Sequence, residues 1–172
     1  VKLNVVVVRG MNDEEVVDFA ALTLEHDWTV RFIEYMPLGD SSLSELPGSE
    51  VIVTAEEIVA RISAIHGDLQ PIDRSREAGV GPANVFSLPG ARGRIGFIHA
   101  MSQPFCESCN RLRLTAGGEL RSCLFDGGEI SLLGMLRPTD QVRLKQAFTD
   151  CLSLKPRVHS GRGNRAMSQL GG

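Results

Sequence analysis

The N-terminal part of the chain alternates between apolar, strand-like runs and one amphipathic segment. Residues 2–8 (KLNVVVV) are rich in β-branched side chains, which is typical of a buried strand. Asn12 and Glu15 form a capping-box pattern, and apolar residues recur after them at helical spacing as far as His26. Residues 29–34 (TVRFIE) are a second strand candidate. Strand, helix and strand in this order predict a parallel βαβ unit.

The middle of the chain changes from loop to helix and back to loop. Residues 37–48 are rich in Ser, Gly and Pro, which predicts a loop. Thr54 and Glu57 form a second capping-box pattern, and the apolar face that follows predicts a helix extending to Ile65. Residues 67–82 are polar and turn-rich, so we expect another connecting region there.

From residue 83 onward the apolar runs become short and closely spaced, which predicts an antiparallel β region. The strand candidates are residues 83–88, 94–99, 112–115 and 119–124, and a last helix is expected over residues 140–152. Ala116-Gly117-Gly118 predicts a hairpin turn between the last two strands. The whole pattern predicts an α/β fold in which the end of an α/β layer or barrel (1–66) precedes an antiparallel region (67–155) and a tail (156–172).

Composition and charge narrow the function classes. The 172 residues are 42% hydrophobic and 23% charged, which is ordinary for a globular protein, and the net charge of −3 disfavours a general nucleic-acid binder. All 21 acidic residues precede residue 151, whereas residues 151–172 carry four basic side chains. This basic tail indicates either a local anionic partner or disorder. Because the sequence starts with Val1 inside a strand-like run, we expect it to lack an N-terminal part.

Three of the four cysteines form the strongest candidate site. Cys106, Cys109 and Cys123 have the spacing C-x2-C-x13-C, which in an intracellular chain first indicates a metal site. The predicted hairpin would fold Cys123 back beside the other two, so that three thiolates can converge on one metal centre. The spacing alone does not decide between structural zinc and an iron–sulfur cluster. Cys151 follows the apolar rhythm of the last helix, so we expect it to be buried and structural.

Basic side chains near the cysteines predict an anion site. On a strand, Arg111 and Arg113 would point to the same face, and two neighbouring guanidinium groups suit a phosphate. Arg31 lies within an apolar strand and requires an anionic partner or solvent. Lys2 and Met36 lie near the ends of the two parallel strands, where α/β folds place their sites. A solvated strand face, a frayed terminus and a packed core are the simpler explanations for the arginine pair, Lys2 and Met36, respectively.

Several of these motifs are similar to those of a known family. Residues 105–115 (FCESCNRLRLT) with residues 123–125 (CLF) resemble the C-terminal cluster motif of the molybdenum cofactor biosynthesis protein A family, the GTP 3′,8-cyclases. The resemblance extends over residues 1–13, 18–22 and 30–39 and includes the ending MSQLGG. It implies a radical S-adenosylmethionine enzyme on an incomplete (β/α) TIM-like barrel. Such an enzyme converts GTP to (8S)-3′,8-cyclo-7,8-dihydroguanosine 5′-triphosphate, a lyase reaction in molybdopterin synthesis.

The resemblance also implies roles for individual residues. Cys106, Cys109 and Cys123 would ligate a C-terminal 4Fe-4S cluster whose open iron faces the guanine. The substrate GTP would be bound by Lys2, Arg31, Arg111, Leu112 and Arg113, S-adenosyl-L-methionine would be touched by Met36, and Gly171 and Gly172 would be catalytic.

The resemblance further implies what this sequence would need in order to act. It lacks the CxxxCxxC motif that would hold a second 4Fe-4S cluster, so we expect this chain to be inactive without the N-terminal half of the barrel. We expect a cytoplasmic protein with no nucleic-acid or membrane partner, and the full-length protein could form a homodimer. From the residues alone, the alternative is a non-enzymatic, zinc-stabilised binding module.

Overall fold

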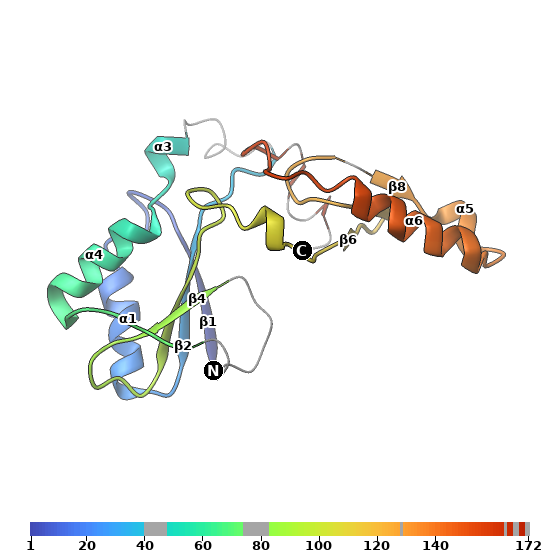
Figure 1. The fold of residues 1–172 in the computed structure, drawn as a ribbon. Helices are drawn as coiled ribbons and strands as arrows, with labels where there is room; N and C mark the ends of the chain where they lie inside the picture. Colours follow the sequence, from blue (N-terminus) through green and yellow to red (C-terminus); the bar gives the residue numbers. More distant parts are fainter. Residues whose placement is uncertain (40–47, 74–82, 128, 164, 167–168, 171–172) are drawn as a thin grey trace. The chain divides into compact units, whose positions relative to one another are not determined.

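The computed structural model describes residues 1–39, 48–73, 83–127, 129–163, 165–166 and 169–170. The chain divides into two compact units (Figure 1). The first unit comprises Val1–Tyr35 and Leu46–Phe105, and the second comprises Met36–Glu45 and Cys106–Gly172. The domain limits expected after residues 66 and 155 therefore fall inside these units. No helix in the described ranges is long and apolar enough to cross a membrane.

The first unit is built on a mixed five-stranded sheet with the strand order β1-β2-β5-β4-β3. The strands are β1 (Lys2–Val7), β2 (Thr29–Glu34), β3 (Gln70–Pro71), β4 (Asn84–Ser87) and β5 (Arg94–Ile98). Strands β1, β2 and β5 run parallel, and β4 and β3 extend the sheet in antiparallel fashion. The predicted βαβ unit is confirmed. Strand β5, however, is a parallel neighbour of β2, and the prediction that it belongs to the later antiparallel region is wrong.

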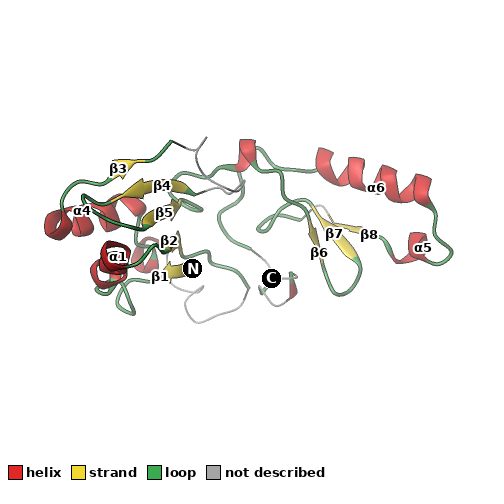
Figure 2. Cartoon of the chain, turned by 90° about the horizontal axis from the view of Figure 1, so that it is seen from below, coloured by secondary structure: helices red, strands yellow, loops and turns green. Residues whose placement is uncertain are grey.

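Helices α1 (Val16–Glu25) and α4 (Ala55–His66) cover one face of this sheet (Figure 2). A further short helix, α3 (Gly48–Val51), precedes α4. The core between sheet and helices is formed by alternate strand residues and one side of each helix, namely Val5, Val7, Val30, Phe32, Ile95 and Phe97 with Val16, Ala20, Ile58 and Ile62. The rings of Phe32 and Phe97 stack with centroids 5.9 Å apart. The core therefore fixes which side chains of β1 and β2 point to the opposite face.

That opposite face is only partly covered. Lys2 and Asn4 are exposed, Arg31 and Ile33 are half-buried, and Val6 is 44% exposed. The prediction of a buried strand therefore holds for only one face of β1. Its β-branched run satisfies strand propensity along the whole segment, but only alternate residues reach the core.

The helix ends agree with the sequence at one predicted cap and not at the other. Thr54 caps α4, and its hydroxyl accepts a hydrogen bond from Glu57 N at 3.3 Å. Asn12 does not cap α1, which begins after Glu15 without a side-chain cap. Instead, Asn12 Oδ1 accepts from Val8 N at 2.8 Å and its amide donates to Val6 O at 2.9 Å. Asn12 thus stabilises the turn after β1, a role that a short polar side chain fills equally well.

The second unit contains a three-stranded antiparallel sheet in the order β6-β7-β8, followed by two helices. These elements are β6 (Arg113–Leu114), β7 (Glu119–Arg121), β8 (Glu129–Ser131), α5 (Leu133–Leu136) and α6 (Gln141–Ser153). The predicted hairpin turn is confirmed, with Gly118 at a φ of 76°. The predicted last helix is also confirmed, and Asp140 caps it by accepting from Arg143 N at 3.0 Å. Strand β8 is three residues long and had no counterpart among the strand candidates.

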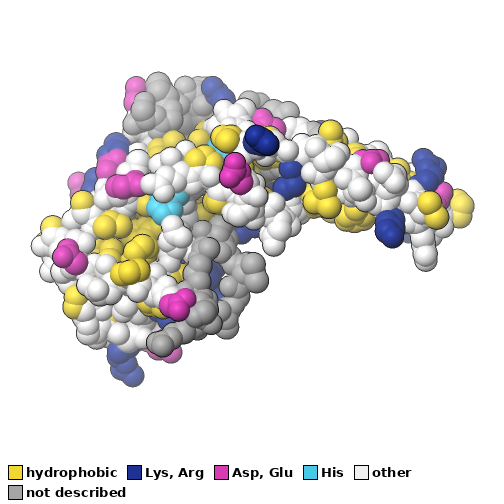
Figure 3. All heavy atoms as spheres, viewed as in Figure 1, with side chains coloured by type: hydrophobic (Ala, Val, Ile, Leu, Met, Phe, Trp, Pro, Cys, Tyr) yellow, Lys and Arg dark blue, Asp and Glu magenta, His cyan; other side chains and the backbone are white. Residues whose placement is uncertain are grey.

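The core of the second unit is small. It consists of Leu120, Leu132, Ala147 and Cys151, with a few half-buried neighbours. Several apolar side chains of α6 remain at the surface, among them Val142 (80% exposed) and Phe148 (44% exposed). Figure 3 shows such apolar atoms among basic side chains on this part of the molecule. With so little apolar burial, polar contacts must contribute much of what orders this unit.

We expect Gly93→Ala to be strongly destabilising, because the backbone at Gly93 lies close to the backbone of residues 26–28. A methyl group there would lie 2.6 Å from His26 O and closer still to Trp28 O, and backbone atoms cannot yield. The free energy of unfolding should fall by about 2–3 kcal/mol in urea denaturation. Gly134→Ala in α5, where nothing lies within 4 Å, is the control and should leave stability unchanged or slightly higher. Equal effects at the two positions would contradict this explanation.

Candidate functional site

The first two cysteines of the motif lie on one tight turn. Residues Cys106–Ser108 form a short 3-10 helix, and Cys109 N donates to Cys106 O at 3.1 Å. Cys106 begins this 3-10 helix and Cys109 directly follows it, so the two cysteines are separated by a single turn. Both cysteines are half-buried, and neither is in a disulfide. The C-x2-C spacing thus presents two thiols together, as a metal-binding turn requires.

A buried carboxylate anchors the segment that leads to this turn. Glu34, at the end of β2, is only 2% exposed. Its Oε2 accepts from Met101 N at 2.7 Å and from Ser102 N at 2.8 Å, and the Ser102 hydroxyl donates to Oε1. Three donors on one buried carboxylate hold the chain a few residues before Cys106. Sequence reasoning missed Glu34, although a glutamate at the end of an otherwise apolar strand was a usable signal.

The hairpin brings Cys123 into the same unit as the cysteine turn. Strands β6 and β7 pair Arg113 with Arg121, and Cys123 follows two residues later. Arg113 lies within electrostatic reach of both Cys109 and Cys123. Burial lowers the pKa of the Arg113 guanidinium and the charge of Arg111 lowers it further, whereas the two thiolates act in the opposite direction. Arg113 therefore marks the point where the two cysteine-carrying segments meet.

Arg111 and Arg113 were predicted to lie on one strand, and this prediction is wrong. Strand β6 begins only at Arg113, so Arg111 lies in the preceding loop, where it is exposed. Arg113 and Leu112 are half-buried. The two guanidinium groups are nevertheless electrostatic neighbours. They can still act on one anion, but from a loop and a strand end instead of one strand face.

Lys155 is a second residue that sequence reasoning missed. It lies just after α6, and its ammonium donates to Arg111 O at 2.7 Å and to Ser122 O at 2.9 Å. The Cys109 Sγ lies 3.7 Å from the same nitrogen. The only sequence signal was its membership of the basic tail, because backbone carbonyl partners leave no trace in the residue pattern.

The spacing of the thiols bears on which metal centre they could form. Within the described part of the chain, which includes all four cysteines, no group of three or more His, Cys, Asp or Glu side chains is placed to hold a single metal ion. In an iron–sulfur cluster each thiolate binds a different iron, so the ligands need not converge on one point. Cysteine thiols are chemically suited to such a cluster, and Cys109 and Cys123 lie near the cations Lys155 and Arg113. The ligand set Cys106, Cys109 and Cys123 stays a prediction.

Cys151 differs from these three, as expected. It is fully buried in the small core of the second unit, and its thiol contacts Leu120 O at 3.8 Å. Burial raises the pKa of the Cys151 thiol, which disfavours the thiolate that a metal requires. The prediction of a buried, structural cysteine is confirmed.

Arg31 lies on the partly open face of the first sheet. Its partners in the neighbouring strands are Asn4 and Gly96, and Arg31 Cγ lies 3.2 Å from where a Cβ at Gly96 would be. The Arg31 Nε is buried and has no hydrogen-bond partner among the described residues. Buried donors are nearly always satisfied, so this guanidinium is suited to an anion that the sheet itself does not provide.

The other two residues predicted near these strands are not gathered at one sheet edge. Lys2 is exposed and shares the Arg31 face, because the register pairs Lys2 with Thr29 and Asn4 with Arg31. Lys2 begins β1, whereas Met36 follows the carboxyl end of β2. Met36 therefore follows the carboxyl end of a parallel strand, where α/β folds place their sites, whereas Lys2 lies at the start of one.

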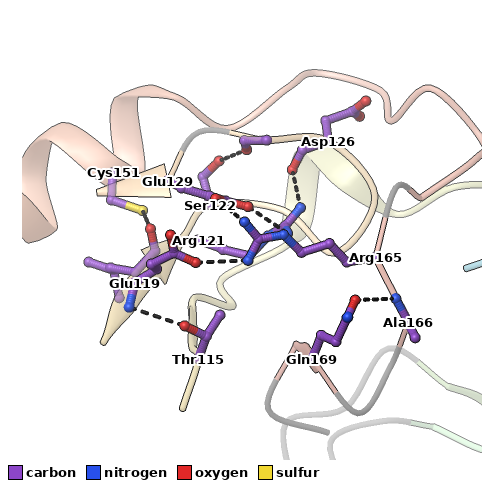
Figure 4. Close-up of polar contacts among 12 residues, drawn as sticks. Thr115, Glu119, Arg121, Ser122, Asp126, Glu129, Cys151, Arg165, Ala166 and Gln169 are labelled. Carbon is purple, nitrogen blue, oxygen red and sulfur yellow. Dashed lines mark hydrogen bonds and ion pairs between the residues drawn. The ribbon is translucent and has the colours of Figure 1, made fainter. Parts of the chain in front are cut away.

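The described part of the tail is docked on the second unit. Arg165 Nη1 pairs with Glu119 at 2.7 Å and Nη2 with Glu129 at 2.9 Å, which ties the tail to β7 and β8 (Figure 4). Gly163 N donates to Pro37 O at 3.0 Å, and Leu170 is fully buried. The anionic partners of Arg165 are thus the protein's own carboxylates. Gly171 and Gly172, predicted to be catalytic, lie outside the described residues.

Comparison of the sequence with known proteins places the chain in a family. Residues 28–161 match the family described as Molybdenum Cofactor Synthesis C. A GTP 3′,8-cyclase from Moorella thermoacetica is 48% identical over 177 residues, covering 100% of this chain and 53% of the relative. Those from Pelotomaculum thermopropionicum and Nostoc punctiforme are 46% and 42% identical, with 100% and 99% of this chain covered and again 53% of each relative. The chain therefore spans about half the length of the curated relatives it matches.

We expect Glu34→Gln to loosen the approach to the cysteine turn. A glutamine oxygen can still accept from Met101 N and Ser102 N, but the amide nitrogen cannot accept from the Ser102 hydroxyl, and the negative charge that strengthens all three bonds is lost. The free energy of unfolding should fall by about 1–3 kcal/mol in chemical denaturation. Glu56→Gln is the matched control, because Glu56 accepts an exposed bond from neighbouring Gln103, and it should cost less than about 0.5 kcal/mol. A Glu34 variant as stable as the Glu56 variant would show that the carboxylate does not anchor this segment.

Proposed function

The chain belongs to the Molybdenum Cofactor Synthesis C family, and we propose that it supplies the substrate-binding part of a GTP 3′,8-cyclase. The observation that carries the proposal is the arrangement in the second unit, where Arg113 lies within reach of Cys109 and Cys123. Cysteine ligands beside arginines suit a protein that binds an iron–sulfur cluster and a nucleotide together. The complete enzyme would form (8S)-3′,8-cyclo-7,8-dihydroguanosine 5′-triphosphate from GTP by radical S-adenosylmethionine chemistry.

The proposed cluster ligands are Cys106, Cys109 and Cys123. A 4Fe-4S cluster held by three thiolates leaves one iron open, and that iron would bind the guanine of GTP. The protein's part would be to keep Cys106 and Cys109 close together on one turn and to fix the Cys123 segment through the hairpin. The adjacent cations Lys155 and Arg113 would offset the negative charge of the ligated thiolates.

The proposed substrate contacts are basic side chains and one leucine. Arg111 and Arg113 would donate charged hydrogen bonds to GTP, with Leu112 between them packing against it. In the first unit, Lys2 and Arg31 share one sheet face and would bind phosphate oxygens. The buried Arg31 Nε, without a partner among the described residues, supports this assignment. Met36 would contact S-adenosyl-L-methionine. A CxxxCxxC segment outside this sequence would bind the cluster that cleaves S-adenosyl-L-methionine. That segment and the parallel strands of the first unit would belong to one barrel.

The tail is proposed to end in catalytic residues. Gly171 and Gly172 lack side chains, so a chain end carrying them can enter a narrow cleft and adopt backbone angles closed to other residues. The docking of the preceding tail through Arg165 and Leu170 supports this role.

We expect Cys106→Ser, Cys109→Ser and Cys123→Ser each to abolish most iron binding after anaerobic reconstitution with iron and sulfide. A serine hydroxyl is a poor ligand for iron at neutral pH, so a cluster with only two of its three thiolate ligands should dissociate from the protein. Iron and sulfide per chain, with absorbance near 400 nm, provide the measurement. Cys151→Ser is the control and should retain iron even if it lowers stability. Iron loss in the Cys151 variant, or stoichiometric zinc in the unmodified protein, would contradict the proposed ligand set.

We expect removal of either arginine of the pair to weaken GTP binding by the complete enzyme. A charged hydrogen bond contributes about 1.5–3 kcal/mol, so Arg111→Ala or Arg113→Ala should raise the Kd roughly 10- to 150-fold in calorimetry. Lysine keeps the charge but not the planar fork, so Arg→Lys should restore only part of the affinity. Arg143→Ala, at an exposed position on α6, is the control. An unchanged Kd in the double Ala variant would rule out this contact.

A further inference from the structure

The side chain of Lys155 makes three hydrogen-bond contacts within the second unit. Its backbone N donates to Leu152 O at 3.2 Å at the end of α6, and its side chain is half-buried. The ammonium contacts Arg111 O at 2.7 Å, Ser122 O at 2.9 Å and Cys109 Sγ at 3.7 Å. An ammonium carries three N–H donors, so these three contacts match its full donor capacity. Ordering a lysine this completely costs side-chain entropy, which the three contacts must offset.

The two carbonyl partners belong to the two segments that carry the cysteines. Arg111 follows Cys109 by two residues, and Ser122 directly precedes Cys123. Ser122 is 1% exposed, and its hydroxyl lies 3.3 Å from Leu154 O, the residue before Lys155. The end of α6 and the Cys123 segment are therefore joined twice, once through each side chain. One cation thus ties the cysteine turn, the end of β7 and the end of α6 together.

We propose that Lys155 is a positioning residue for the cysteine ligands: it sets the spacing of the Cys109 and Cys123 segments and donates an N–H···S hydrogen bond to the Cys109 sulfur. This inference rests on the proposed function. A hydrogen bond from a cation to a ligand sulfur stabilises the more negative, reduced form of an iron–sulfur cluster. Lys155 should therefore raise the reduction potential of the cluster as well as favour its assembly.

A purely structural tie is the competing explanation, and the two differ in one measurable quantity. A tie that only joins backbone segments would change stability and iron uptake but leave the potential of any assembled cluster unchanged. An N–H···S donor changes the potential itself. The decisive readout is therefore the reduced fraction of the assembled cluster, measured by electron paramagnetic resonance at fixed applied potentials.

The experiment reconstitutes this chain anaerobically with iron and sulfide and compares three variants with the unmodified protein. Lys155→Met keeps the apolar stem but removes all donors, so iron per chain should fall. The ratio of reduced to oxidised cluster at a fixed potential should drop roughly tenfold, which corresponds to about 59 mV for a one-electron couple. Lys155→Gln keeps N–H donors for the carbonyls without the charge, so it should fold and still show a lower ratio. Lys145→Met removes a charge from an exposed position on α6 and should match the unmodified protein.

The outcomes separate this inference from the proposed function. If the unmodified chain assembles the cluster and the Lys155→Gln variant has an unchanged ratio, Lys155 is not a donor to the cluster ligand, while the cluster assignment stands. If Lys155→Met does not fold, the Lys155→Gln variant alone decides. If the unmodified chain assembles no iron–sulfur cluster, the proposed function and this inference both fail.

Discussion

The pairing of β6 with β7 is the constraint on which the candidate site depends. It places Arg113 opposite Arg121, and so fixes the chain after Cys109 against the chain before Cys123. The hairpin can close tightly because Gly118 adopts a positive φ at the end of the loop. This register brings the two segments together, and the contacts of Lys155 with Arg111 O and Ser122 O then add to it.

An ion-pair network around the buried Arg121 extends that constraint to the rest of the second unit. Arg121 is fully buried, and its guanidinium lies 2.6 Å from Glu129 on β8. Arg165 pairs with the same glutamate and with Glu119, so β7, β8 and the tail share one set of charges (Figure 4). Burying an arginine has a large desolvation cost, which the close carboxylates offset, and removing one partner would leave a buried charge. In a unit with a small apolar core, this network makes one arrangement of strands and tail preferable to others.

The features that could be predicted from the sequence are those that depend on residues close together in the chain. The βαβ unit followed from the change between strand and helix periodicity, and Thr54, the hairpin turn and the last helix followed from cap and turn residues. Asn12 was misassigned because one short polar side chain can cap a helix or close a turn, and the nearby backbone decides which. The parallel partner of β5 could not be predicted, because strand neighbours distant in sequence are selected by tertiary packing. Lys155 was missed for a related reason, since its partners are backbone carbonyls that any residue provides.

The account stands or falls on whether this chain holds an iron–sulfur cluster with one iron that lacks a protein ligand. Mössbauer spectroscopy of the unmodified chain, reconstituted anaerobically with isotopically enriched iron, tests this directly. We expect about four iron atoms per chain in a 4Fe-4S cluster, with one iron site distinguishable from the other three because it has no thiolate. Addition of GTP should change the signal of that one site. Iron in four equivalent sites, or a colourless protein that retains only zinc, would contradict the account.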